Sequence, residues 1–252
     1  MTFNSKISIN VCALLILFTL INSVKAAVLV RAHYWKQPNV LNVLFLDGSP
    51  QLQQQVKTIA PQWLQQTRLS FRFFTALDEI PAQTHIRISF KRHNGSQLGD
   101  HRDYKSRFPT MNLSRLNSDQ MSQRAATRLI LHEFGHALGF EHEYQSRYWP
   151  YGQKPLRIIL AKCYPKMEAI GYTPQQAIDR CREVNKTLNQ KQAYQTAYDE
   201  ASIMSYPLTW TQTNGENKDI VATYQLSYLD HYAIQLWYAK IPEKSITQPK
   251  VE

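Results

Sequence analysis

The feature that most constrains this chain is an apolar helical segment with three histidines and a glutamate at fixed spacing. It begins at His132 and reads His-Glu-Phe-Gly-His-Ala-Leu-Gly-Phe-Glu-His-Glu. Residues four apart on a helix are turned by only about 40°, so His132 and His136 lie on one face. Gly139 permits the left-handed turn that ends a helix and brings His142 back toward them. Three neutral imidazoles leave a position open for water, which predicts a catalytic zinc site with Glu133 beside that water.

The alternative is that these histidines are core residues satisfied by hydrogen bonds. The expected helix runs from about Asp119 to Gly139, with Asn117 or Ser118 as its N-cap, and its apolar residues lie nearly all round it. Such a helix must run inside the domain. Burying three imidazoles and a carboxylate there without a cation is unfavourable by several kcal/mol, which favours the metal site. The other histidines fit no ligand spacing and are expected to be surface or packing residues: His33, His85, His93, His101 and His231.

The residues before this helix predict strand, helix, strand, strand. A buried strand is expected at 40–46, and a helix at 52–63 that Pro61 must kink or restart. A second strand is expected at 69–74. At 85–90 apolar and polar residues alternate, as in a half-buried strand.

The residues after the histidine segment predict mostly short helices. Two are expected within 156–188, and a final helix beginning near Leu226 carries Ile234, Leu236 and Trp237 on its apolar side.

The amino terminus has the pattern of a signal peptide. Lys6 precedes the apolar run 11–21, and small residues follow up to a cleavage site after Ala26. The run is shorter than the ~20 residues that span a bilayer, so a membrane anchor is the lesser alternative. We therefore expect residues 1–26 to be removed and the mature protein to be secreted, into the extracellular space or the periplasm.

Cysteine use agrees with an oxidising compartment. Cys12 leaves with the signal peptide, whereas Cys163 and Cys181 remain as an even pair. They can form a disulfide that ties the two helices within 156–188 together. Two unpaired buried thiols are the alternative.

The charge distribution and the absence of sequence repeats limit the possible partners and the number of domains. The net charge is +10, but the basic residues are scattered between apolar positions, which favours a solvated basic surface over nucleic-acid binding. With no internal repeat or long low-complexity linker, residues 27–245 are expected to form a single catalytic domain followed by a tail at 246–252.

The segment from His132 to His142 resembles the extended zinc signature of the metzincin peptidases. Phe140 and Glu143 make it similar to the astacin family in particular, and weaker similarity to bacterial members covers most of the mature chain. A second match is Ser-Ile-Met-Ser-Tyr, which ends at Tyr206 and resembles the family's Met-turn.

This resemblance carries roles onto further residues. It implies that Met204 forms the hydrophobic floor beneath the imidazoles and that Tyr206 reaches toward the metal or stabilises the oxyanion. In the family, the position of Glu143 can bind the mature amino terminus.

The resemblance also implies a fold and an activity. The expected fold is the α+β metzincin (zincin) fold: a twisted, mostly parallel sheet with an antiparallel edge strand, a backing helix and an active-site helix, above an irregular helical lower subdomain. The upper subdomain would span 27–142 and the lower one 143–245. The expected activity is that of a monomeric zinc endopeptidase with one catalytic Zn²⁺ and protein or peptide substrates.

Two other functions remain open on the residues alone. One is a binding or adhesion module that keeps zinc for stability but is inactive, and Glu133 argues against it because a structural site does not need that carboxylate. The other is a zinc hydrolase that cleaves a non-peptide bond, such as an amide in cell-wall material.

Overall fold

A computed structural model gives the arrangement of most of the chain after Ala26. The described residues are 27–91, 94–150, 167–168, 171–183, 187–195, 197–205, 207 and 220–239. The predicted signal peptide at 1–26 and the tail at 246–252 lie outside them.

Five strands form the main sheet, in the order β3-β2-β4-β6-β5. Their bounds are β2 (Val40–Phe45), β3 (Ser70–Phe74), β4 (Ile86–Ser89), β5 (Gly95–Ser96) and β6 (Met111–Asn112). The pairs β2–β3, β2–β4 and β4–β6 are parallel, whereas β5 runs antiparallel to β6 at the edge. The prediction of a mostly parallel sheet with an antiparallel edge strand is confirmed.

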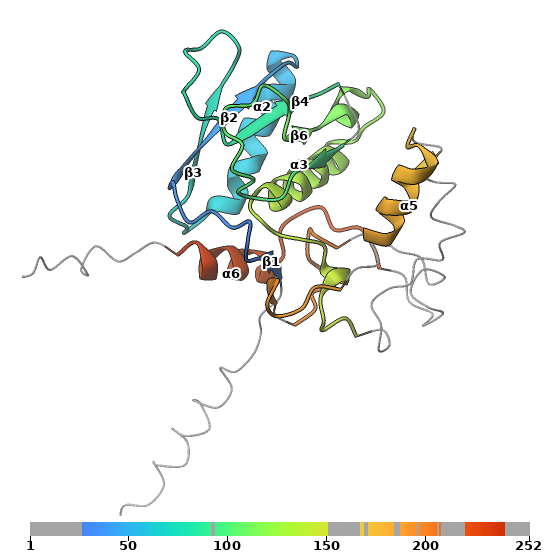
Figure 1. Ribbon diagram of the computed structural model, residues 1–252. Helices are drawn as coiled ribbons and strands as arrows, with labels where there is room; N and C mark the ends of the chain where they lie inside the picture. Colours follow the sequence, from blue (N-terminus) through green and yellow to red (C-terminus); the bar gives the residue numbers. More distant parts are fainter. Residues whose placement is uncertain are drawn as a thin grey trace, which may run out of the picture.

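Two helices pack against this sheet and against each other. Ser49 caps α2 (Pro50–Ile59), because its hydroxyl accepts a hydrogen bond from the Leu52 amide and Pro50 stands at a position where no amide proton is needed. Pro61 lies in the separate 3₁₀ helix η1 (Ala60–Leu64), as the predicted restart requires. The second helix, α3 (Gln123–Ala137), runs beneath the sheet in Figure 1.

The remaining elements are β1 (Val28–Val30), the 3₁₀ helices η2 (Ser114–Asn117) and η3 (Glu143–Gln145), α5 (Pro174–Glu183), β7 (Ala193–Gln195) and α6 (Tyr228–Trp237). Of these, β1 and α6 lie below α3 in Figure 1 and α5 lies to its right. β1 pairs antiparallel with β7. The helix α5 is the second of the two predicted within 156–188; most of the range expected for the first lies outside the described residues. Within the described part of the chain, no helix is long and apolar enough to cross a membrane.

One continuous hydrophobic core joins the sheet to the helices. Val43 and Ile88 of the sheet, Ile130 and Phe134 of α3, and Ile234 of α6 belong to the same cluster of buried side chains. Because α3 lies inside this cluster, its carboxyl-terminal half is held from several sides.

The prediction that β4 is half-buried was wrong. All four of its residues are buried, including Arg87 at 1% exposure. The guanidinium donates hydrogen bonds to the main-chain oxygens of Thr84, Asp103 and Phe108, at 2.9, 2.7 and 2.7 Å. The chain between β5 and β6 therefore covers the polar face of β4. It supplies two of the three carbonyl acceptors, and the Asp103 carboxylate lies 3.7 Å from the guanidinium.

Two helix details also differ from the prediction. The helix α3 begins at Gln123 with Ser122 as its N-cap, and not at Asn117 or Ser118, because η2 occupies the residues just before Ser118. In α6, Leu236 is 46% exposed, and the buried positions are Asp230, Ala233 and Ile234.

Candidate metal centre

The last turns of α3 bring two of the histidines to one face. His132 and His136 are buried, with 6% and 8% of their surfaces exposed. Gly139 has a φ of +97°, the left-handed conformation expected at the end of the helix. Two carbonyl groups at the end of the helix are satisfied by side chains, since Trp35 Nε1 donates to Ala137 O at 2.8 Å and Tyr238 Oη donates to Leu138 O at 2.7 Å.

The structure brings His142 to the other two predicted ligands. Its Nε2 atom lies 3.1 Å from Nε2 of His136 and 3.3 Å from Nε2 of His132. Ligand atoms of all three side chains lie within 4.8 Å of one another, and among the described residues this is the group of histidine, cysteine and acidic side chains that could hold a metal ion.

Each imidazole is oriented through its other ring nitrogen. His132 Nδ1 lies 2.9 Å from Ile203 O, and His136 Nδ1 lies 2.8 Å from Phe140 O. A carbonyl oxygen can only accept, so these Nδ1 atoms carry the proton and leave the Nε2 lone pairs directed at the shared centre. His142 Nδ1 lies 2.9 Å from the hydroxyl of Tyr144.

Burial keeps these imidazoles neutral. Desolvation lowers the pKa of His136 to about 4, and it lowers the pKa values of His132 and His142 well below their usual range. The neighbouring imidazoles lower the pKa values of His132 and His142 further. All three rings are thus available as neutral ligands at ordinary pH.

Two of the three separations between ligand nitrogens match those around a tetrahedral zinc ion. Bond lengths of about 2.0–2.1 Å at tetrahedral angles place two ligand nitrogens about 3.3 Å apart. The 3.1 and 3.3 Å separations agree with this value. Unprotonated nitrogens at this distance repel each other unless a cation lies between them, so the residues present fit the metal.

Glu133 is a buried acid that follows the first histidine of this group. It follows His132 on α3, turned about 100° from it and about 60° from His136. Its side chain is 6% exposed, and Oε2 has no hydrogen-bond partner among the described residues. Burial raises its pKa to about 8. A buried carboxyl oxygen without a protein partner is expected where a water or substrate binds.

A turn from the carboxyl-terminal half of the chain packs against the same helix. The Met204 sulfur lies against α3 at Gly135, so close that a methyl group on Gly135 would come within 2.3 Å of it. Asp230, at the start of α6, fixes the turn: its carboxylate accepts hydrogen bonds from the Ile203 amide at 2.9 Å and the Ser202 hydroxyl at 2.7 Å. The assignment of Met204 as the floor of the site stays a prediction.

Other predicted site residues are described only in part. Tyr206 and Cys163 lie outside the described residues, and Cys181 is buried in α5. Glu143 is 1% exposed and accepts a hydrogen bond from the Asp199 amide at 3.2 Å. Burial raises the pKa of Glu143 well above its usual value.

Sequence reasoning missed two residues that support the site. Tyr144 contacts the third histidine, and nothing in the local pattern indicates it. Asp230 could have been noticed, because Ser227 and Asp230 form a capping box in which each side chain accepts a hydrogen bond from the other residue's amide, both at 2.9 Å.

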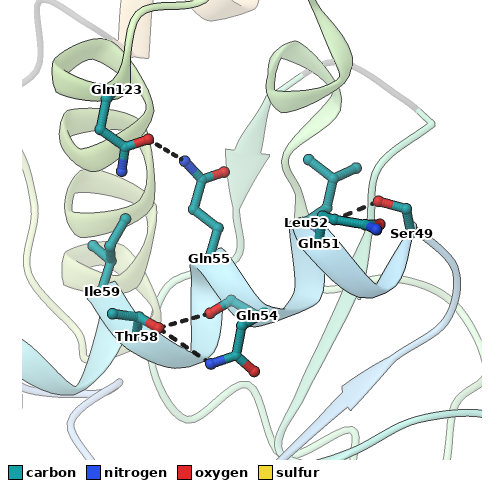
Figure 2. A pocket seen from close by; sticks show the side chains of 8 residues that line it. All are labelled: Ser49, Gln51, Leu52, Gln54, Gln55, Thr58, Ile59 and Gln123. Atoms are coloured by element: carbon teal, nitrogen blue, oxygen red, sulfur yellow. Dashed lines mark hydrogen bonds between the residues drawn. The ribbon is translucent and has the colours of Figure 1, made fainter.

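A pocket of about 450 Å³ lies between α2 and the start of α3 (Figure 2). Its lining consists of Ser49, Gln51, Leu52, Gln54, Gln55, Thr58, Ile59 and Gln123. Gln123 precedes His132 by about 14 Å along the helix axis. With no ionisable side chain in its lining, this pocket lacks groups for acid–base or metal chemistry.

Comparison with known proteins gives matches among solved structures. No protein-family model matches the sequence, and no curated protein does. A structure of myroilysin matches at 26% identity and a TM-score of 0.71, over 85% of this chain and 100% of that one. A second myroilysin structure matches at 26% identity and a TM-score of 0.60, over 83% and 87%.

A third match is more distant. High choriolytic enzyme 1, a hatching enzyme zinc-protease from the medaka fish Oryzias latipes, shares the fold at 20% identity and a TM-score of 0.51, over 82% of this chain and 94% of that one.

Proposed function

We propose that this chain, which is an astacin-like metzincin and a zinc-dependent endopeptidase, cleaves peptide bonds with Glu133 as its general base. The family and the single catalytic zinc rest on the shared fold and on the three-histidine group. The role of Glu133 is supported by one observation above all: a buried carboxyl oxygen that has no hydrogen-bond partner in the described part of the chain follows the first of three converging imidazoles.

The residues divide the chemistry among them. His132, His136 and His142 would hold the zinc, which when bound acidifies a water molecule and polarises the substrate carbonyl. Glu133 takes a proton from the attacking water and then delivers it to the leaving amine. Its burial suits this work, because a carboxylate in an apolar setting binds a proton more tightly than one in water. Tyr206 would donate a hydrogen bond to the oxyanion, worth about 3 kcal/mol in the transition state.

The substrate would bind in extended form along the edge of the sheet. β5 is the antiparallel strand at the edge of the sheet. One of its edges is paired with β6, and a substrate would add to the opposite edge. A peptide that adds to such an edge is held by main-chain hydrogen bonds, which carry little sequence preference. Specificity would then depend mainly on the pocket beside the zinc.

We further propose that the enzyme is a secreted monomer without a membrane anchor, with Ala27 as its first residue and a Cys163–Cys181 disulfide. Ala27 is buried, as expected for the start of a folded domain at 27–245, and Cys181 is fully buried. Mass spectrometry of protein collected from the culture medium would report the terminus and the disulfide together. A mass that includes residues 1–26 would contradict secretion by this route.

The general base is tested with Glu133→Gln, which keeps the size of the side chain. The variant is expected to bind zinc one to one but to digest casein and gelatin at least about 100-fold more slowly, the contribution of a general acid–base group. Glu79→Gln makes the same change at an exposed position and should leave the rate unchanged.

Three outcomes of this experiment would contradict the proposal. Undiminished digestion by Glu133→Gln would remove the general-base role. A zinc-loaded parent without activity would indicate the binding module, and activity on cell-wall fragments but not on gelatin would indicate a non-peptide hydrolase.

A further inference from the structure

The three histidines of the metal group are not oriented in the same way. His132 and His136 lie on a buried helix, and main-chain carbonyl groups fix their Nδ1 atoms. His142 lies after the helix, in an extended conformation, and its Nδ1 atom faces the hydroxyl of a side chain, Tyr144. The orientation of the third imidazole therefore depends on an atom that a point mutation can remove.

Tyr144 contacts this imidazole in two ways. Its hydroxyl lies 2.9 Å from His142 Nδ1, and its ring stacks on the imidazole with 5.1 Å between centroids and 12° between planes. The hydrogen bond fixes the direction of Nδ1, and the stacking fixes the plane of the ring. Together they direct Nε2 at His132 and His136.

The main chain around Tyr144 is anchored on both sides. The Glu143 amide donates a hydrogen bond to Met204 O at 3.4 Å, and Gln145 O accepts one from the Leu188 amide at 3.0 Å. The Gln145 side chain also accepts a hydrogen bond from the His142 amide at 3.3 Å. Side chains two positions apart do not face each other on a regular helix, so the contact requires this short η3 turn after an extended residue. Tyr144 itself is 2% exposed.

Among the described residues, the side chains of Glu141 and Gln145 also approach this imidazole. Glu141 Oε2 lies 3.7 Å from His142 Nδ1, beyond hydrogen-bonding distance. When Nε2 serves as the ligand atom, Nδ1 carries the proton and donates a hydrogen bond to the Tyr144 oxygen.

We propose that Tyr144 is a positioning residue for the third zinc ligand, acting through His142. The inference rests on the proposed zinc site but not on the role of Glu133. By this proposal, zinc affinity depends on Tyr144, a residue that follows the zinc signature and is not itself a ligand.

The test measures zinc binding by the full chain without any substrate. Protein stripped of metal is titrated with Zn²⁺ against a chromophoric chelator, for the parent and for Tyr144→Phe, which keeps the stacked ring but removes the hydroxyl. We expect Tyr144→Phe to bind zinc about 10- to 100-fold more weakly, the usual effect of losing a partner of a ligating histidine. Tyr148→Phe makes the same change at a 43% exposed residue and should bind as the parent does.

Two further measurements distinguish a positioning role of Tyr144 from a purely structural one. The metal-free Tyr144→Phe protein should unfold at the parent's temperature, and its Co²⁺ form should show altered absorption bands, because the third imidazole is turned. Unchanged zinc affinity, an equal loss in Tyr148→Phe, or a loss explained by lower stability of the metal-free protein would overturn the proposal.

A second pair of variants tests the hydroxyl without relying on Tyr144→Phe. Tyr144→Gln restores a hydrogen-bonding oxygen without a ring, whereas Tyr144→Leu has neither. Tighter zinc binding by Tyr144→Gln than by Tyr144→Leu is expected. Equal affinities would show that the oxygen does not matter and would overturn the assignment.

Discussion

Adding one methyl group to Gly135 should destabilise the folded enzyme, because the methyl group would clash with the Met204 side chain. An ideal Cβ on Gly135 would lie 2.3 Å from the Met204 sulfur and 3.0 Å from Cζ2 of Trp63. Favourable carbon contacts need about 3.5–4.0 Å, so the thioether must move by more than an ångström. Met204 is 2% exposed and therefore has little room to do so.

Two opposing effects set the magnitude for Gly135→Ala. Alanine is favoured over glycine inside a helix by about 1 kcal/mol. Overpacking a core is unfavourable by about 1–3 kcal/mol. We expect the clash to win, with a net loss of ~1–2 kcal/mol and a fall in Tm of about 5 °C. Urea denaturation of the zinc-loaded protein measures the loss in unfolding free energy.

A double-mutant cycle assigns the effect to the pair. Met204→Ala alone should destabilise by ~2–5 kcal/mol because it leaves a cavity. In Gly135→Ala/Met204→Ala the new methyl group has space, so the combined loss should be smaller than the sum by ~1–3 kcal/mol. Strictly additive losses, or a Gly135→Ala protein at least as stable as the parent, would refute the reasoning.

Two further predictions concern buried charges. Arg87→Leu leaves three main-chain carbonyl groups without their donor and should lower the unfolding free energy by roughly 3 kcal/mol, measured by urea denaturation; a loss below 1 kcal/mol would contradict the importance of these bonds. Burial raises the pKa of Asp230 to about 6, above its unfolded value, so its contribution to stability is complete below about pH 4 and is lost as pH rises through 6. The unfolding free energy of the parent relative to Asp230→Asn should therefore fall between pH 4 and pH 7, and a constant or rising difference would disprove this.

The metal group was predictable because its geometry is local. A helix fixes the relation of His132 to His136 whatever surrounds it, and Gly139 supplies the turn that returns His142. Three strands of the sheet, β2, β3 and β4, were predictable from their apolar runs for the same reason, whereas the two-residue strand β6 was not predicted. The edge position of β5 came with the family resemblance, since no two-residue strand can be read from periodicity.

The rest depended on tertiary contacts that no local pattern carries. The alternation in β4 indicated a solvent-facing side, yet the chain between β5 and β6 folds over it and supplies acceptors for Arg87. Ser118 and Ser122 are both good N-caps, and the 3₁₀ turn η2 decides between them. Tyr144 meets His142 only because an extended residue is followed by a short turn.

The anchoring of the Met204 turn makes the orientation of His132 depend on residues far along the chain. Asp230 holds the Ile203 amide, and the Ile203 carbonyl orients His132. The zinc signature ends at residue 142, but the groups that orient its first histidine come about 60 and 90 residues later in the chain, and contacts between residues so far apart in the sequence slow folding. A chain truncated before Ile203 would therefore carry the three histidines without the carbonyl group that orients the first of them.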